Sequence, residues 1–226
     1  AFLMHYNGKD VEAFDGRETA PAAADEKLFI SADGKPMQFY DAVVGGRSVG
    51  TPGTLRVLEM AHQQYGKLPW SALFQPAINL AENGFKVSAR LNTLAQAEQH
   101  LKKDPTAAAY FYQPDGNAVA VGTTLRNPEL AAVLKRIAAE GSKAFYECDI
   151  AQAIVQKVRS HPSNPGKLSV ADLAGYKPVK RAALCTDYRA QQRDYRLCGF
   201  PPPSSGAITI GQILGMLNHT NAAQLP

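Results

Sequence analysis

The chain reads Phe14-Asp15-Gly16-Arg17-Glu18-Thr19-Ala20-Pro21 near its beginning, and this stretch decides how the first part of the sequence folds. Two apolar runs precede it and flank Asn7-Gly8, and such a pair between apolar runs is the strongest short-range signal for a β-hairpin. We therefore predict a hairpin over residues 1–17. After Arg17, Thr19 or Pro21 can open an alanine-rich helical turn.

This arrangement places Arg17 at the end of a strand, where loops carried by rigid elements commonly present binding groups. A guanidinium there can hold a carboxylate by two parallel hydrogen bonds, which fix its orientation as well as neutralise its charge. The alternative is an exposed ion pair between Arg17 and Asp15 or Glu18. On chemistry alone that pair is the commoner outcome and contributes little.

Residues 52–175 have the periodicity of helices, because apolar residues recur three and four positions apart. In the first predicted helix Leu55, Leu58 and Ala61 point inward; in the second, Leu73 and Leu80 do. Ser169 is expected to cap the last, short helix. The predicted helices are 52–65, 69–82, 88–102, 128–140, 143–159 and 170–174.

The remaining segments read as strands and loops. Residues 31–50 have the composition of a loop, and 110–122 that of short extended pieces. Two strands, 180–185 and 195–199, precede a helix at 208–217, so a strand pair and a helix fill 180–220. Ser204 or Ser205 is expected to cap that helix. Helices and strands in separate regions indicate an α+β fold.

Composition excludes several classes of function. The 226 residues are 45% hydrophobic and 19% charged, as in an ordinary globular protein, and the net charge of +4 is too small and too scattered for a nucleic-acid surface. No apolar run reaches the roughly 20 residues of a membrane span. The five histidines lack metal-ligand spacing, so we predict neither a metal nor a cofactor.

The three cysteines bear on the compartment in which the protein folds. Cys185 and Cys198 lie on consecutive predicted strands, where cross-strand neighbours can reach disulfide distance. A disulfide there would imply an oxidising compartment. Two buried free thiols explain the same sequence equally well. Cys148 has no histidine near it in sequence and is expected to be an inert packed thiol.

Five stretches of the chain, in the same order, resemble the motifs of the γ-glutamyltranspeptidase family. They extend over nearly the whole sequence, and five motifs in register are far more specific than any one of them. The stretches are Asp15-Gly16-Arg17-Glu18-Thr19-Ala20-Pro21, Gly50-Thr51-Pro52-Gly53, Gln75-Pro76-Ala77-Ile78 with Leu80-Ala81-Glu82-Asn83-Gly84-Phe85, Asp172-Leu173-Ala174-Gly175-Tyr176 and Pro201-Pro202-Pro203-Ser204-Ser205-Gly206.

The resemblance implies a helix-rich part of the αββα sandwich of N-terminal-nucleophile hydrolases. It further implies that residues 1–226 are one partial large-subunit domain, that a segment precedes it, and that the nucleophile lies on a separate small subunit. In the family a threonine at the start of that subunit is the nucleophile, marked by a Thr-Thr-His-type sequence. Thr123-Thr124-Leu125 lacks the histidine, so we expect no catalytic residue in this chain.

The resemblance also implies the reaction: cleavage of the γ-glutamyl amide of glutathione through a threonine acyl-enzyme, with the small subunit produced by autoproteolysis as partner. Arg17 would bind the substrate's α-carboxylate, and Asp15 and Glu18 would orient it. Because family members typically work outside the cytosol, we expect a periplasmic or extracellular location, which favours the disulfide between Cys185 and Cys198. The alternatives are an acylase acting on β-lactam side chains or polyglutamate, and a non-catalytic helical scaffold.

Overall fold

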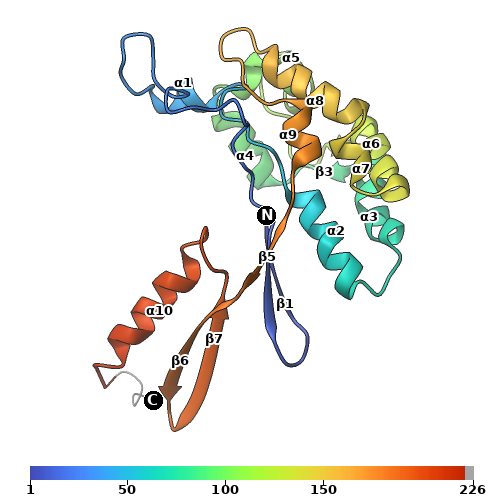
Figure 1. Cartoon of the computed structure of the whole chain (residues 1–226). Coiled ribbons are helices and arrows are strands. Elements are labelled where there is room, and N and C mark those ends of the chain that lie inside the picture. The colour runs from blue at the N-terminus through green and yellow to red at the C-terminus, as the bar shows by residue number, and fades with distance from the viewer. Residues whose placement is uncertain (222–226) are drawn as a thin grey trace. The chain divides into compact units, whose positions relative to one another are not determined.

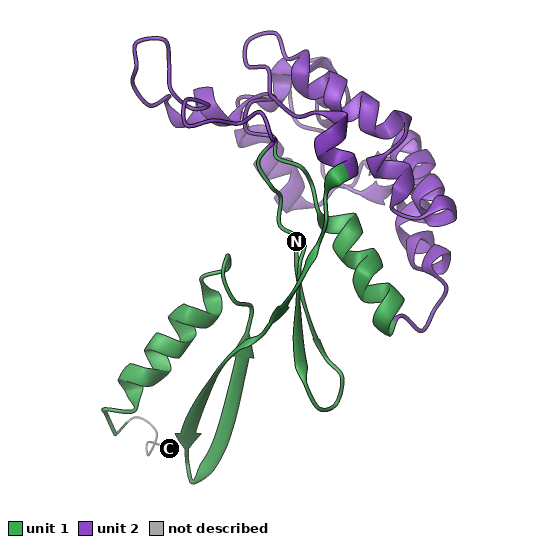
Figure 2. Ribbon diagram, in the orientation of Figure 1, with its two compact units in different colours: residues 1–20, 50–65, 175–226 green, residues 21–49, 66–174 purple. Residues whose placement is uncertain are grey.

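The structure is a computed structural model in which residues 1–221 are described (Figure 1). The last five residues of the predicted domain 1–226 therefore lie outside the description. The chain divides into two compact units (Figure 2). Unit 1 comprises Ala1–Ala20, Gly50–Tyr65 and Gly175–Pro226, and unit 2 comprises Pro21–Val49 and Gly66–Ala174.

Unit 1 contains a three-stranded antiparallel sheet. Strand β1 (Phe2–Tyr6) pairs with β2 (Val11–Asp15), which pairs in turn with β5 (Val179–Ala182). The first two strands form the hairpin that the apolar pattern predicts, with Phe2 opposite Asp15. Residues 7–10 form its turn, since Tyr6 is paired with Val11. The Asn7 Oδ1 atom stabilises the turn by accepting hydrogen bonds from the Lys9 and Asp10 amides at 2.9 and 2.8 Å.

Helix α2 (Thr54–Tyr65) supplies the other half of a small core in unit 1. Phe14 and Val57 are completely buried there, and Ala61 packs beside them. The inward face predicted for this helix was wrong at Leu58, which is 39% exposed. Ala61 is buried as predicted, and Val57, four positions before it, packs in the core in place of Leu58.

The end of unit 1 is a second sheet with a helix beside it. Strands β6 (Leu184–Ala190) and β7 (Arg193–Gly199) pair antiparallel, and α10 (Gly206–Leu217) packs along them (Figure 1). The single strand predicted over 180–185 is divided between β5 and β6, which belong to different sheets. The chain thus changes sheets at Ala183.

Unit 2 is built mainly of helices. Ser88, Asp104 and Asn127 cap three of them by accepting amide hydrogen bonds. A short strand pair, β3 (Phe85–Lys86) with β4 (Thr124–Leu125), links two of the connections. The helices are α1 (Phe39–Val43), α3 (Trp70–Asn83), α4 (Ala89–Ala97), α5 (Pro105–Phe111), α6 (Pro128–Glu140), α7 (Lys143–Tyr146), α8 (Asp149–Arg159) and α9 (Val170–Gly175), with a 3₁₀ turn at Leu101–Lys103.

Helices α3 and α6 form the main packed pair of unit 2. The buried residues of α3 are Ile78 and Ala81, whereas Leu73 and Leu80, which we expected to point inward, are 49% and 56% exposed. The indole N–H of Trp70 donates a hydrogen bond to the Ile137 carbonyl at 3.0 Å, which ties the start of α3 to α6. The choice of buried face thus follows the partner helix.

The structure differs from the predicted elements of unit 2 in three places. The helix expected over 143–159 is broken into α7 and α8 at Cys148, whose backbone is extended. Helix α5 lies mostly in residues for which no element was predicted and runs into the stretch 110–122, which was expected to be extended. Helix α1 lies within the predicted loop 31–50. Ser169 does cap α9 as predicted, since its Oγ atom accepts from the Asp172 amide at 3.1 Å.

A buried asparagine organises the loop after α1. Asn164 is 5% exposed, and its Nδ2 group donates to the carbonyls of Asp41 and Val44 at 2.9 and 2.8 Å. Its Oδ1 atom accepts from the Arg47 Nε–H at 2.6 Å. A second donor of Arg47, Nη1, reaches the Leu28 carbonyl at 2.7 Å. One side chain thus connects several loop segments of unit 2.

Candidate functional site

Arg17 lies just after β2, two residues beyond the last residue of that strand. Its side chain is 49% exposed. The Nη1 group donates to the Pro203 carbonyl at 3.2 Å, and Nε lies 3.4 Å from a Glu18 carboxylate oxygen. The guanidinium is therefore anchored at two points while half of the side chain remains accessible.

The backbone of Arg17 is held on both sides of the residue. Its N–H donates to Asp15 Oδ1 at 2.8 Å, and its carbonyl accepts from the Tyr176 hydroxyl at 2.7 Å. Burial, followed by the charges of Asp15 and Glu18, raises the pKa of Tyr176 above its ordinary value. The phenol therefore keeps its proton at neutral pH and remains a donor.

Asp15 is buried, with 6% exposure, and its second carboxylate oxygen is also engaged. Oδ2 accepts from the Arg181 Nε–H at 2.8 Å. Arg181 lies on β5 opposite Ala13, and Ala13 and Asp15 share one face of β2 because side chains alternate along a strand. A buried carboxylate requires such a partner, since an unpaired charge in the interior is costly.

Two glycines allow the segments around Arg17 to approach one another. A Cβ atom on Gly53 would lie 2.0 Å from the Tyr176 hydroxyl and 2.6 Å from the Gly16 carbonyl. A Cβ atom on Gly16 would lie 2.4 Å from a Val57 methyl carbon. The turn at 50–53 is also bonded to the Arg17 segment, because Thr19 and Thr51 exchange backbone hydrogen bonds of 3.2 and 2.8 Å.

Unit 1 thus brings together residues from four of the five motifs. They come from 15–21, 50–53, 172–176 and 201–206. Residues of the first, third and fourth of these contact Arg17, and Thr51 of the second pairs with Thr19. The result is a half-exposed guanidinium, that of Arg17, on a backbone held by hydrogen bonds. Beside it lies the buried Asp15 carboxylate, which is paired with Arg181. Such a group can bind a carboxylate.

The remaining motif, 75–78 with 80–85, lies in unit 2 and includes the end of helix α3. Gly84 has a φ of 86°, a left-handed conformation that favours glycine, and its N–H donates to the Leu80 carbonyl. Asp172, from the fourth motif, accepts hydrogen bonds from the Ala22 and Ser169 amides at 2.8 Å each. These residues stabilise helix ends and a loop of unit 2.

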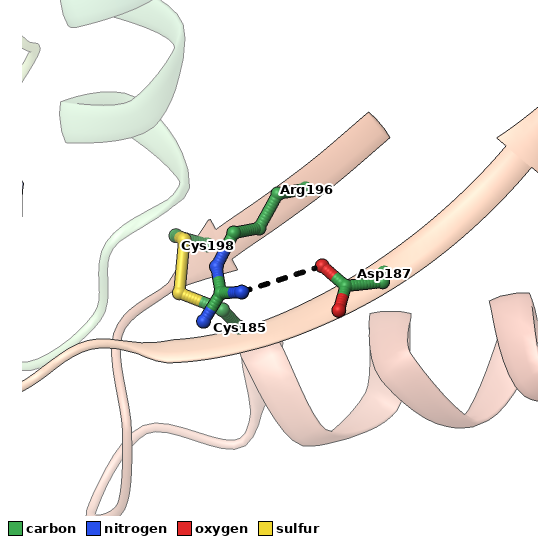
Figure 3. The surroundings of a disulfide bond; sticks show 4 residues. All are labelled: Cys185, Asp187, Arg196 and Cys198. Carbon is green, nitrogen blue, oxygen red and sulfur yellow. Dashed lines mark ion pairs between the residues drawn. A yellow bond between two sulfur atoms is a disulfide. The ribbon is translucent and has the colours of Figure 1, made fainter. Parts of the chain in front are cut away.

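The disulfide that the sequence left open against two free thiols is present between Cys185 and Cys198 (Figure 3). The two residues are directly opposite in the β6–β7 register, with Cα atoms 4.0 Å apart. Two residues further along the hairpin, Asp187 and Arg196 lie opposite each other and form an ion pair at 3.6 Å. Cys148 is the free cysteine.

The serine pair of the last motif lies at the start of α10. Ser205 occupies the N-cap position, but its side chain makes no capping hydrogen bond. The Ser204 hydroxyl instead accepts from the Gly206 amide at 3.4 Å. Of the two serines that the sequence offered as alternative caps, only Ser204 accepts a hydrogen bond from the first turn, at the long distance of 3.4 Å. Among residues 1–221 no helix is long and apolar enough to cross a membrane.

Comparison with known proteins identifies the family. A model described as Gamma-glutamyltranspeptidase matches residues 1–226. The glutathione hydrolase proenzyme of Bacillus subtilis is 35% identical over 225 residues, which cover 99% of this chain and 37% of that protein. The Escherichia coli glutathione hydrolase proenzyme is 34% identical over 219 residues, covering 96% and 36%. The chain thus spans a little over a third of the length of these relatives.

Solved structures agree with the sequence relatives. The γ-glutamyltranspeptidase of Helicobacter pylori matches with a TM-score of 0.89 and 29% identity, covering 100% of this chain and 63% of that chain. The transpeptidase CapD of Bacillus anthracis matches with a TM-score of 0.73 and 30% identity, covering 97% and 64%. The fold is therefore a helix-rich part of the αββα architecture of N-terminal-nucleophile hydrolases. The chain belongs to the γ-glutamyltranspeptidase family.

The sequence suggested Asp15, Arg17 and Glu18 as candidate site residues but not the residues that contact them. Tyr176 was quoted as part of a motif without a role, and nothing set Arg181 apart from the other arginines. A register between β2 and β5 would have placed Arg181 near Asp15. That register joins strands more than 160 residues apart, and no local pattern specifies it.

Proposed function

We propose that this chain is part of an enzyme that cleaves the γ-glutamyl amide of glutathione and related compounds. In this proposal residues 1–226 belong to the large subunit and supply its scaffold, while the nucleophilic threonine lies at the start of a small subunit released by autoproteolysis. The threonine oxygen attacks the γ-carbonyl, the amine leaves with a proton, and the acyl group passes to water or to an acceptor amine. Arg17 binds the α-carboxylate of the γ-glutamyl group.

The observation that carries the proposal is the state of Arg17. Its backbone is fixed by Asp15 and Tyr176, yet half of its side chain is exposed, with Glu18 and the Pro203 carbonyl as its neighbours. An arginine with a purely structural role would direct its donors inward. A fixed, accessible guanidinium suits a ligand carboxylate. In this proposal Asp15 orients Arg17 through the backbone amide, and Glu18 holds the guanidinium by an ion pair with Nε.

The disulfide supports a location outside the cytosol, because such bonds persist in oxidising compartments. The proposal therefore places the protein in the periplasm or outside the cell.

An acylase is the second candidate. A solved cephalosporin acylase from Bacillus halodurans matches with a TM-score of 0.75 and 27% identity, covering 91% of this chain and 37% of that one. CapD of Bacillus anthracis, another structural relative, is named a transpeptidase and not a glutathione hydrolase. Arg17 favours the γ-glutamyl substrate, because it offers a partner for an α-carboxylate.

The test is the Arg17→Lys substitution in the complete protein, assayed with a γ-glutamyl anilide and with the same anilide bearing an α-carboxamide. A partly buried charge-assisted contact contributes about 1.5–3 kcal/mol, so KM for the carboxylate substrate should rise at least about tenfold. The preference for the carboxylate over the carboxamide should fall by the same factor. Arg189→Lys is the matched control, since Arg189 is 71% exposed and pairs with Asp194 at the hairpin tip.

An unchanged KM with an unchanged preference between the two anilides would overturn the assignment of Arg17. A wild-type protein that cleaves neither anilide but releases acyl groups from a β-lactam side chain would establish the acylase instead. A protein active on none of them would favour the scaffold without catalysis.

A further inference from the structure

Arg17 owes its position to side chains that enter the sequence about 160 residues later. Asp15 forms hydrogen bonds to both the Arg17 amide and the Arg181 guanidinium, and the Tyr176 hydroxyl reaches the Arg17 carbonyl. We propose that Arg181, acting through Asp15, and Tyr176 are positioning residues for substrate binding by Arg17. This inference rests on the proposed function and deepens it.

The first step of the argument is the geometry of the Asp15 carboxylate. Its two oxygens serve different donors, each at 2.8 Å: Oδ1 the Arg17 N–H and Oδ2 the Arg181 Nε–H. The carboxylate can rotate only if both bonds break together. Removing the Arg181 side chain would leave Oδ2 buried without its partner, because the Asp15 side chain is only 8% exposed.

The second step concerns charge. A substrate carboxylate that approaches Arg17 also approaches Asp15, whose negative charge opposes it. Arg181 offsets that charge through a direct ion pair, and at 37% side-chain exposure the pair is only partly screened by water. Without Arg181 the buried carboxylate would weaken anion binding at Arg17 even if the backbone stayed in place.

The third step is the opposite side of Arg17. The Tyr176 hydroxyl donates to the Arg17 carbonyl at 2.7 Å and reaches it through space that Gly53 leaves open, since a Cβ atom there would lie 2.0 Å from that hydroxyl. Together with the bond from Asp15 to the Arg17 amide, this contact fixes both peptide groups of the arginine. Such fixing reduces the freedom that substrate binding would otherwise remove.

The experiment compares Arg181→Gln, Arg181→Lys, Asp15→Asn and the double variant Asp15→Asn/Arg181→Gln in the complete protein. Arg181→Gln should raise KM for the γ-glutamyl anilide about tenfold while kcat changes less than about threefold, the pattern of lost ground-state and transition-state binding alike. Arg181→Lys restores the charge and should recover most of the affinity. The double variant should bind better than Arg181→Gln alone, because no unpaired buried carboxylate remains.

Tyr176→Phe removes one hydrogen bond and should raise KM about threefold. Arg189→Gln is the control for loss of an arginine and should leave KM and kcat unchanged. Thermal unfolding of each variant separates positioning from loss of folded protein, because a merely less stable enzyme loses active sites and hence kcat, not affinity.

Three results would overturn the inference: an unchanged KM in Arg181→Gln, a fall in kcat alone, or Arg181→Lys no better than Arg181→Gln. If the wild-type protein cleaves no γ-glutamyl anilide, the proposed function fails, and crystal structures decide the positioning claim. A displaced Arg17 backbone in Arg181→Gln relative to wild type would support it, and an unmoved one would overturn it.

Discussion

Arg17 in unit 1 and Arg47 in unit 2 are two arginines in loops, and the structure uses them in opposite ways. Arg47 directs Nε onto Asn164 Oδ1 and Nη1 onto the Leu28 carbonyl, so its donors connect parts of its own unit. Arg17 has its backbone fixed by Asp15 and Tyr176 while its side chain stays 49% exposed. Arg47 stabilises a loop, whereas the side chain of Arg17 is accessible to a ligand.

The comparison teaches that the presence of hydrogen bonds does not tell the two roles apart, because both arginines make them. The backbone does not tell them apart either, because the Arg47 amide also donates, to the Asn164 carbonyl at 3.2 Å. What differs is the exposure of the guanidinium: Arg47 is partly buried among its acceptors, whereas half of the Arg17 side chain is exposed. Fixing the backbone and leaving the guanidinium accessible pre-organises a binding group. Fixing the guanidinium consumes its donors. The substitutions below test this distinction and the contacts on which each unit depends.

Asn164→Asp should give the largest effect. The substituted carboxylate cannot donate to the carbonyls of Asp41 and Val44, so these part-buried acceptors lose their donor and face a negative charge that is itself buried at position 164. We expect unit 2 to lose about 3–4 kcal/mol of stability. Hydrogen exchange followed peptide by peptide should show lost protection within residues 21–49. Retained protection there would mean that Asn164 is not the residue holding the loop.

Gly53→Ala tests the corresponding close approach in unit 1. The added methyl group would overlap the Tyr176 hydroxyl and the Gly16 carbonyl, and overpacking of this kind costs about 2–3 kcal/mol. Denaturant unfolding measures the loss. Gly215→Ala is the control, because a Cβ atom there meets nothing within 4 Å and alanine is the better helix former. Equal stability of the two variants would contradict the packing described for Gly53.

The double substitution Cys185→Ala/Cys198→Ala should destabilise the β6–β7 hairpin by about 2 kcal/mol, since the bond closes a short loop with a sequence separation of 13. Alkylation followed by mass measurement tests the bond directly. Without reductant one label is expected, on Cys148, and with reductant three. Three labels in both samples would eliminate the disulfide.

Arg47→Lys gives the smallest effect and bears most directly on the comparison. A lysine cannot reproduce both donor directions, so unit 2 should lose about 1–2 kcal/mol, while KM stays unchanged. Arg17→Lys should do the reverse. If Arg47→Lys changed KM or Arg17→Lys chiefly changed stability, the division of roles would be wrong.

Local signals account for what the sequence predicted well. The hairpin follows from Asn7-Gly8 between apolar runs, and helix α6 begins at the Asn127 cap and ends at Gly141, whose φ is 78°. The same kind of signal exists for α5, where Asp104 caps a helix with Pro105 in its first turn, and it was overlooked. These elements depend on neighbours in sequence, so the sequence contains them.

Non-local pairing accounts for what could not be predicted. Helix α3 carries apolar residues around its circumference, so periodicity could not choose Ile78 and Ala81 over Leu73 and Leu80. The candidate site has the same limitation. Arg17 was identified by its motif, but the partner of Asp15 depends on β5 pairing with β2. Only the folded arrangement selects Arg181.

The pairing of β2 with β5 also orders events during synthesis. The hairpin of β1 and β2 can form as soon as residue 15 is available, because its contacts are local. Tyr176 and Arg181 reach the ribosome exit only after all of unit 2 has been made, so its helices can fold while Arg17 still lacks the contacts that fix it. The arginine that we propose to bind a carboxylate therefore gains the contacts that fix it only when the large intervening segment is complete.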